Sequence, residues 1–278
     1  MYLLFTACKN DEIVNSRPIT VSFETNKTSA PIGSPLEIKY HFQIDSNSAP
    51  IDQDYTIFVH FLDSYGSLLF TDDHTPPDSF SQTSAWKAGD SIEYQRTVFI
   101  PLYPYLGTAK VEIGLYIPET GERLALNEVN STEVGTIELL DQKENIFLVY
   151  KEGWHQLETD PDNPNSGIEW QWTKKEAVCS FRNPKQDSIL YIQGDTNTGA
   201  FEEPLEVSIL IGETEIFTFT VNQRDPFLQR IPIPANALTE EDWVDLRIVN
   251  SQSFIPMESG ISDDSRELGL RVFHLYVD

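Results

Sequence analysis

The sequence predicts an all-β protein built from two tandem β-sandwich domains, the first immunoglobulin-like and the second jelly-roll-like. Three observations support this prediction. Helix signals are almost absent, short runs of alternating apolar and polar residues recur along the chain, and turn residues separate these runs. The 278 residues are enough for two domains, and a hydrophobic content of 40% is enough for two cores.

The first domain is predicted over residues 18–140. It contains seven or eight strand-like runs at the spacing of a β-sandwich. The clearest are ITVSFET, LEIKYHFQI, YTIFVHFLD, DSIEYQRTVFI, AKVEIGLYI and TIELL. The tight turn PETGER, which follows AKVEIGLYI, predicts a return of the chain into LALN.

The second domain is predicted over residues 146–278, after a short polar linker, DQKEN. Nine further strand-like runs extend from IFLVY to LGLRVFHLYV and favour a jelly roll. The segment 235–243, ANALTEEDW, is the one stretch with helical character, and it is too short for more than one or two turns.

The charge balance excludes one class of partner. Nineteen Lys and Arg against 44 Asp and Glu give a net charge of −25. Such a chain has no basic stripe for phosphates, so nucleic acid is not an expected partner. An anionic membrane surface would repel the protein unless a covalent anchor held it there.

The first residues suggest such an anchor. MYLLFTACKN places an apolar run directly before Ala7 and Cys8, like the end of a bacterial lipoprotein signal. We therefore interpret residues 1–17 as a signal remnant and lipidated tether, with Cys8 carrying the lipid. This predicts an exported protein, periplasmic or anchored in the outer membrane. The run is shorter than a full signal peptide, and the alternative is a chance cysteine in a frayed terminus.

Several phrases of the first domain resemble a known module. They are His60–Asp63, Asp73–Pro76, Thr83–Asp90 and Gly114–Leu124, in the order in which an immunoglobulin-like module of bacterial envelope proteins has them. That module is often appended to membrane glycosyltransferases. The membrane helices of those enzymes are absent from this sequence, so the resemblance implies a fold and an envelope context and no catalysis.

The second half resembles another β-sandwich module of the same envelope proteins. The module opens with Gly-Trp-x-x-x-Glu, continues with an aromatic-x-Trp strand and closes with Asp-x-Arg-x-Leu-Gly. The matching positions here are Gly153, Trp154, Glu158, Trp170, Trp172, Asp264, Arg266, Leu268 and Gly269. The resemblance implies a fold and an envelope context rather than an activity.

Asp72-Asp73-His74 is the segment that most resembles catalytic machinery. A carboxylate beside a histidine can orient it as a base. Adjacent strand residues, however, point to opposite faces of a sheet, so sequence neighbours seldom form a dyad. We favour a structural turn before Pro76 and keep Asp73 and His74 as candidate ligand contacts.

One loop, DPDNPNSG, is rich in oxygen atoms that could bind Ca²⁺. Its candidate ligands are Asp160, Asp162 and Asn163. Pro164 occupies a position where an EF-hand needs a ligand, so we favour a simple turn and predict no cofactor, with Ca²⁺ as the alternative.

Three tryptophans are candidate sugar-binding residues, because exposed aromatic rings stack on sugars. Trp170 and Trp172 share a face of one predicted strand, and Trp154 precedes them. The alternative is that the rings line the core. Trp86 and Trp243 are expected to be structural.

The chain ends in DDSRELGLRVFHLYV. Both faces of its last strand carry apolar residues, which predicts a central strand. Arg266 lies just before it among carboxylates, so we predict a structural pin between Asp264 and Arg266.

Taken together, these patterns favour a non-catalytic cell-envelope lipoprotein that binds a glycan or supports an assembly. Two alternatives stay open: a subunit that scaffolds a membrane protein complex on the periplasmic face, and a glycan-active hydrolase.

Overall fold

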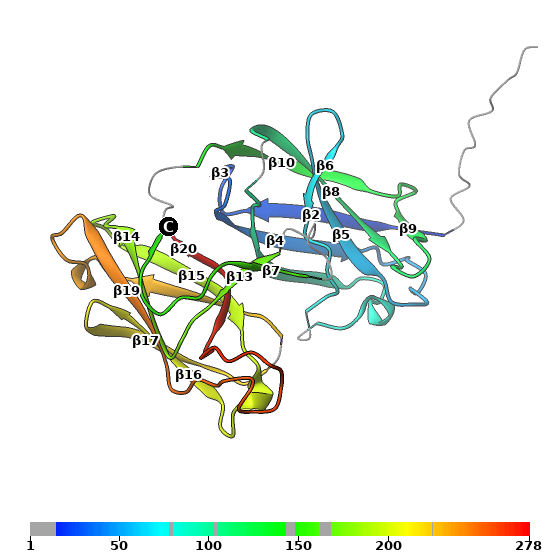
Figure 1. Ribbon diagram of the computed structural model, residues 1–278. Coiled ribbons are helices and arrows are strands. Elements are labelled where there is room, and N and C mark those ends of the chain that lie inside the picture. Colours follow the sequence, from blue (N-terminus) through cyan, green and yellow to red (C-terminus); the bar gives the residue numbers. More distant parts are fainter. Residues whose placement is uncertain (1–14, 78–79, 103–104, 143–147, 162–167, 224) are drawn as a thin grey trace, which may run out of the picture. The chain divides into compact units, whose positions relative to one another are not determined.

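The computed structural model describes residues 15–77, 80–102, 105–142, 148–161, 168–223 and 225–278. The chain divides into two compact units, Met1–Asp141 and Gln142–Asp278 (Figure 1). Both units consist of β-strands joined by loops, so the all-β prediction is confirmed. The described helical segments are short 3-10 turns, and none of them has the length and apolarity to cross a membrane.

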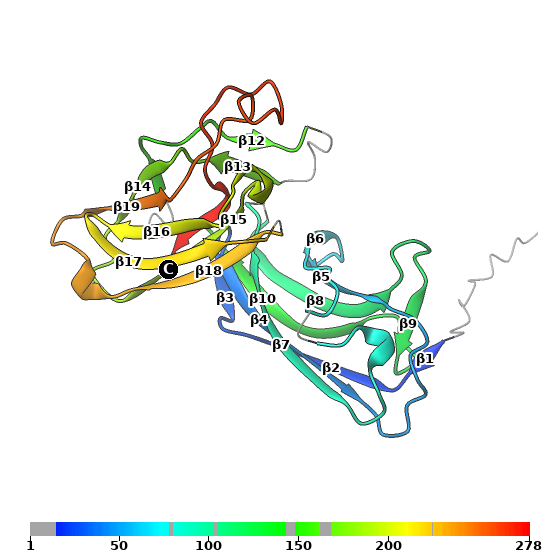
Figure 2. The ribbon, with the colours of Figure 1, turned by 90° about the horizontal axis from the view of Figure 1, so that it is seen from below.

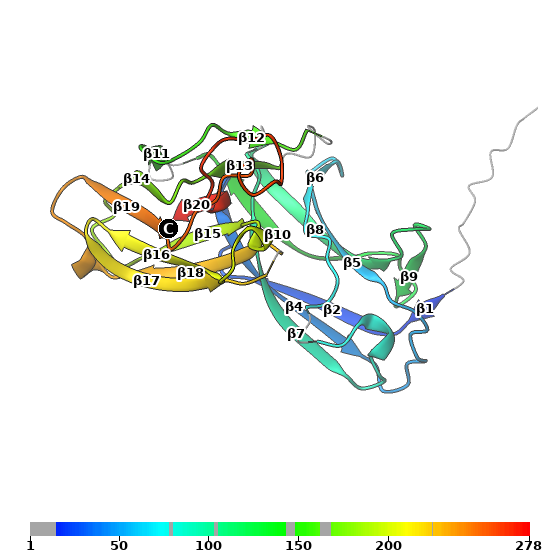
Figure 3. The same cartoon turned by 60° about the horizontal axis from the view of Figure 1, so that its bottom comes forward.

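Unit 1 has two facing sheets. One contains β2, β4 and β7 in that order, and the other runs β3-β10-β8-β5-β6, with β9 and β1 added beside β8. Figure 3 shows β2, β4 and β7 as one layer and β5 and β8 in the other. The strands are β1 (Ser16–Arg17), β2 (Ile19–Thr25), β3 (Ser29–Pro31), β4 (Pro35–Ile44), β5 (Thr56–Leu62), β6 (Leu68–Thr71), β7 (Ser91–Phe99), β8 (Gly107–Tyr116), β9 (Arg123–Leu126) and β10 (Thr132–Leu140).

The immunoglobulin-like order of unit 1 depends on where its first strands lie. β2 pairs antiparallel with β4 in the smaller sheet, and β3 then pairs parallel with β10 in the larger one. The chain thus changes sheets between β2 and β3, which closes both layers over one core. Apolar side chains that alternate along the strands fill that core, among them Ile38, Phe42 and Val59.

Unit 2 is a jelly roll. One sheet has the order β11-β14-β19-β16-β17 and the other β12-β13-β20-β15-β18, so successive strands from β13 to β16 alternate between the sheets. The strands are β11 (Leu148–Tyr150), β12 (Glu158–Thr159), β13 (Glu169–Trp172), β14 (Glu176–Arg182), β15 (Ser188–Asp195), β16 (Leu205–Ile211), β17 (Thr214–Val221), β18 (Phe227–Ile233), β19 (Trp243–Asn250) and β20 (Arg271–Val277).

Local sequence explains individual elements of unit 2. β16 and β17 lie side by side in Figure 2 and form a hairpin that closes at the pair Ile211 and Thr214. Gly212 takes the first position of this two-residue loop at φ 57°, where a hairpin turn favours glycine. The expected helical stretch 235–243 contains only the 3-10 turn Ala235–Ala237, because Trp243 already begins β19.

β20 is central, between β13 and β15, as its two apolar faces predict. Its alternation is not uniform, however, because the pairing with β15 shifts register at Gln193/Gly194. Leu270 and Val272 lie in the core on one side of this β-bulge, while Leu275 and Val277 pack against the core beyond it. A strict alternation that would place Val272 and Tyr276 on one face is therefore interrupted at this bulge.

Candidate functional site

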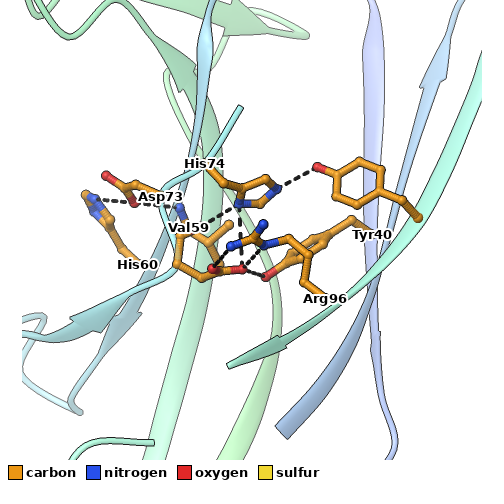
Figure 4. Close-up of polar contacts among 8 residues, drawn as sticks. Tyr40, Val59, His60, Asp73, His74 and Arg96 are labelled. Atoms are coloured by element: carbon orange, nitrogen blue, oxygen red, sulfur yellow. Dashed lines mark hydrogen bonds and ion pairs between the residues drawn. The ribbon is translucent and has the colours of Figure 1, made fainter. Parts of the chain in front are cut away.

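Asp72, Asp73 and His74 follow β6 and separate onto two sides of the larger sheet of unit 1. His74 forms an isolated bridge with Ile57 of β5, so this segment continues the edge of the sheet beyond β6. Figure 4 shows His74 on the same side as Tyr40 and Arg96, and Asp73 on the other side with His60. The alternation expected of extended backbone therefore keeps Asp73 and His74 from forming a dyad.

Asp72 is the centre of the inner group. Its carboxylate accepts two hydrogen bonds from Arg96, at 2.8 Å from Nε and 2.7 Å from Nη2, and a third from the Tyr40 hydroxyl at 2.9 Å. The Asp72 side chain is 8% exposed. Since Tyr40 lies on β4 and Arg96 on β7, Asp72 joins the two sheets of the sandwich.

His74 is bonded at both ring nitrogens within this inner group. Nδ1 lies 2.6 Å from the Asp72 carbonyl oxygen, to which it donates, and Nε2 lies 2.7 Å from the Tyr94 hydroxyl, from which it accepts. Burial, reinforced by the nearby Arg96 charge, lowers the pKa of His74 below 6.5. A neutral ring with these two partners is consistent with that shift.

The inner group therefore acts as a cross-sheet polar lock. His74 is 8% exposed, and burial also raises the pKa of the Tyr40 and Tyr94 hydroxyls. His74, a candidate ligand contact in the sequence, offers no ring nitrogen to a ligand in this arrangement.

Asp73 belongs to a half-exposed group on the outer side of the same sheet. Its carboxylate accepts a hydrogen bond from the Val59 backbone N–H at 3.1 Å and another from the Tyr116 hydroxyl at 3.4 Å. Asp73 Oδ1 also lies 3.8 Å from His60 Nε2. Beside this group the Phe58 ring covers Gly114, where a Cβ would come within 2.4 Å of the ring. Asp73 and His60 thus lie on a partly exposed polar surface.

In unit 2, Trp154 lies apart from the other two tryptophans. Its ring packs against the core, and its indole N–H donates to the Val178 carbonyl at 2.9 Å. Gly153 precedes it at φ 80° and approaches the Glu176 carbonyl so closely that a Cβ would lie 1.9 Å from that oxygen. Trp154 is therefore held by structural contacts, which favours the alternative that this ring lines the core.

Trp170 and Trp172 do share a face of β13, and Arg271 lies against both rings. The Arg271 guanidinium carbon is 5.1 Å from the ring centroid of Trp170 and 5.7 Å from that of Trp172. It is also 5.1 Å from the ring of Phe273, which meets Trp170 edge-on. Arg271 and Phe273 alternate with the core residue Val272, so this cluster is on the outward face of the sheet.

Asp195 fixes the position of Arg271. Its carboxylate accepts hydrogen bonds from Arg271 Nε at 2.7 Å and from Nη2 at 2.6 Å, which together form a forked pair. The two residues lie opposite each other on the paired strands β15 and β20. Gly194 makes this approach possible, because a Cβ there would lie 2.3 Å from the Arg271 carbonyl oxygen. The bulge at Gly194 thus positions the guanidinium against the rings.

Glu158 extends the cluster on its other side. It pairs with Trp170 across β12 and β13, so the two side chains share a face, and its carboxylate accepts a hydrogen bond from Arg266. Arg266 also makes a forked contact with Asp264, at 3.0 Å from Nε and 2.7 Å from Nη2. These contacts lower the pKa of the Asp264 carboxyl. The pin therefore has a third member, Glu158, on β12.

We call this set of outward side chains the aromatic–arginine face. It comprises Glu158, Trp170, Trp172, Asp195, Arg271 and Phe273. The indole N–H of Trp170 is buried there and has no partner among the described residues. Sequence reasoning found the two tryptophans but not Asp195, Arg271 or Phe273 as their neighbours. The sequence shows that Arg271 and Phe273 lie on the same face of their strand, but it does not show that this strand pairs with β13 and β15.

Other predicted sites are only partly within the described residues. Cys8 lies outside them, and so do Asp162 and Asn163, whereas Asp160 is included. Among the described residues no group of three His, Cys, Asp or Glu side chains is arranged to hold a metal ion. Cys179 is a buried free thiol on β14, and burial raises its pKa to about 12.

Comparisons with known proteins find only remote structural similarity. No protein-family model and no curated protein matches the sequence. Among solved structures, a CARDB domain from Pyrococcus furiosus in complex with di-metal ions is 10% identical, covering 45% of this chain and 89% of that chain at a TM-score of 0.28. The tandem CBM22 domain of Paenibacillus barcinonensis Xyn10C is 10% identical over 94% and 91%, at a TM-score of 0.25.

A third similar structure contains the CBM51-2 and INT domains of Clostridium perfringens ZmpB. It is 10% identical and covers 62% of this chain and 37% of that chain, at a TM-score of 0.27. TM-scores at this level carry no inference about function.

Proposed function

We propose that this protein is a non-catalytic binding protein of the cell envelope, that its ligand is a carbohydrate, and that the aromatic–arginine face of unit 2 is the binding surface. The observation that carries the proposal is the contact of Arg271 with Trp170 and Trp172. Flat rings beside fixed hydrogen-bonding groups are the combination that binds the apolar and hydroxyl sides of a sugar.

The groups of this face are held before any ligand arrives. Asp195 is 7% exposed and fixes Arg271 through two hydrogen bonds, while Arg271 and Phe273 confine Trp170. Binding would then order few side chains, which lowers its entropic cost. The Trp170 N–H also lacks a partner among the described residues, but it is buried.

Catalysis is left out of the proposal because of how the most enzyme-like residues are used. Both ring nitrogens of His74 and the Asp72 carboxylate are bonded inside unit 1. Envelope localisation and lipidation at Cys8 belong to the proposal on the sequence pattern alone. Mass spectrometry of the native amino terminus tests them, since a diacylglyceryl Cys8 supports the anchor and an intact Met1 contradicts it.

The binding proposal is tested with Trp172→Ala and a matched control, Trp243→Ala. Trp243 is 47% exposed and lies on β19, in the opposite sheet of unit 2. We expect a glycan array and calorimetry to show binding that Trp172→Ala weakens at least about tenfold. Trp243→Ala is expected to bind like the unaltered protein. Absence of binding across a broad panel, or equal losses in both variants, would reject the proposal.

A protein partner is the second candidate. Two exposed apolar side chains flank the Glu158–Arg266–Asp264 group: Leu157, 56% exposed, precedes Glu158, and Met257, 53% exposed, bonds through its N–H to the Asp264 carbonyl. Exposed apolar residues near fixed charges are common at protein interfaces. Crosslinking in native membranes should recover a constant partner, and Leu157→Ser should abolish its recovery.

A further inference from the structure

The two arginines on and beside the aromatic–arginine face, Arg271 and Arg266, are already paired. Arg271 donates from Nε and Nη2 to Asp195, and Arg266 donates from Nε and Nη2 to Asp264 and from Nη1 to Glu158. A guanidinium in a forked pair has most of its charge compensated. Neither arginine therefore resembles the free cation that an anionic sugar needs.

The charge sum has the same sign as that of the whole chain. Glu158, Asp195 and Asp264 contribute three negative charges and the two arginines contribute two positive ones, which leaves one negative charge. The chain as a whole has a net charge of −25. An incoming carboxylate or sulfate would meet repulsion from both the local cluster and the long-range field.

The hydrogen-bonding capacity that is left suits an uncharged ligand. Arg271 Nη1 has no bond to any described residue, so its N–H groups can donate to a sugar hydroxyl. The aromatic surfaces favour the apolar C–H faces of a sugar ring.

We propose that the aromatic–arginine face selects uncharged glycans and discriminates against glycans rich in uronic acid or sulfate. This inference rests on the proposed function and names the ligand class of the same face. Selection comes from pre-paired arginines: Asp195 and Asp264 neutralise the guanidinium groups that would otherwise attract anions.

The experiment uses polymers that share a backbone and differ in charge. Suitable pairs are hydroxyethyl cellulose with carboxymethyl cellulose, and highly methyl-esterified pectin with its de-esterified form. Calorimetry or affinity electrophoresis on the full chain gives the ratio of affinities within each pair. We expect the uncharged member to bind at least about tenfold more tightly at low salt, and the ratio to shrink in 0.5 M salt as repulsion is screened.

Two single-charge variants test whether the local carboxylates set the ratio. Glu158→Gln removes a charge from the face, and Glu206→Gln removes one from an exposed position on β16 in the opposite sheet. Glu158→Gln should lower the ratio of affinities for the uncharged over the charged polymer several-fold, and Glu206→Gln should leave this ratio unchanged.

The outcomes separate the two proposals. Equal or tighter binding of the charged members, or equal effects of the two variants, overturns charge selection and leaves carbohydrate binding in place. A lack of binding to every polymer, charged or uncharged, in a panel that also includes neutral plant and bacterial glycans overturns the proposed function and this inference with it.

Discussion

Asp72 and Arg96 form a forked ion pair across the two sheets of unit 1, with N–O distances of 2.7 and 2.8 Å. Asp72 is almost fully buried, whereas Arg96 keeps 32% of its side chain exposed. The Tyr40 hydroxyl also donates to the Asp72 carboxylate, and His74 Nδ1 donates to the Asp72 backbone carbonyl. A buried charge with this many partners is costly to leave unpaired.

Asp72→Ala should therefore destabilise unit 1 by about 2–4 kcal/mol. This is less than the loss expected on breaking a fully buried ion pair, because the Arg96 side chain is partly exposed to water. The variant leaves the Arg96 guanidinium and the Tyr40 hydroxyl without their acceptor. Urea unfolding gives the free energy, and hydrogen exchange in peptides from β4 and β7 assigns the loss to unit 1. Asp52→Ala, which removes an exposed carboxylate from a loop of the same unit, is the control.

His74 predicts a pH dependence of stability. Burial lowers its pKa in the folded state below the ordinary value of 6.5, so the unfolded chain binds a proton more readily. The contribution of the neutral ring is complete above pH 6.5 and is lost as the pH falls from there toward the folded-state pKa. His74→Gln should flatten the stability curve between pH 7 and 5 relative to the unaltered protein. Parallel curves for the two proteins would contradict this assignment.

Cys179 should be inert in the folded protein. Its pKa is raised to about 12 by burial, so almost no thiolate forms at pH 8. In a Cys8→Ser chain it is the only thiol, and a thiol reagent should modify it at least about a hundredfold more slowly in buffer than in guanidinium chloride. Rapid modification of the folded chain would show that β14 opens on the timescale of the assay.

The sequence was sufficient for the fold class and for the order of the two domains. Alternation along runs such as ITVSFET and WVDLRIVN predicts strands directly, because each run buries one side chain in two. It was not sufficient for the site. The contact of Arg271 with Trp170 and Trp172 depends on the register between β13 and β20, and that of Asp195 depends on a bulge at Gly194. Register is set by long-range packing, which one sequence does not reveal.

The same limit applies to residues that were predicted in isolation. Asp72, Asp73 and His74 are consecutive, yet their partners come from β4, β5, β7 and β8. Asp264 and Arg266 do pair, because they are two residues apart and the contact is local. Glu158, over a hundred residues away, could be identified only from the resemblance of its motif.

Gly153 and Gly212 give a matched test of how closely the backbone packs. Both have positive φ, 80° and 57°, but a Cβ at Gly153 would lie 1.9 Å from the Glu176 carbonyl oxygen, whereas nothing lies within 4 Å of one at Gly212. Gly212→Ala should cost about 1–2 kcal/mol, the price of a left-handed alanine. Gly153→Ala should cost about 3 kcal/mol or more, since the backbone of β14 must move. Similar melting temperatures for the two variants would contradict the close approach.

The last prediction concerns the loop that Arg266 holds. Through Asp264 and Glu158, Arg266 ties the segment before β20 to β12, and its backbone N–H also bonds to Asp264 Oδ1 at 2.9 Å. Arg266→Gln should loosen residues 255–265 without unfolding the sandwich, because Leu268 and Leu270 beyond them remain buried. Limited proteolysis should then cut within this loop several-fold faster. Arg247→Gln is the matched control, since Arg247 also binds two carboxylates, Glu176 and Glu213, on the opposite sheet. Faster cleavage of this loop in both variants would mean that general destabilisation, rather than loss of the Arg266 contacts, opens it.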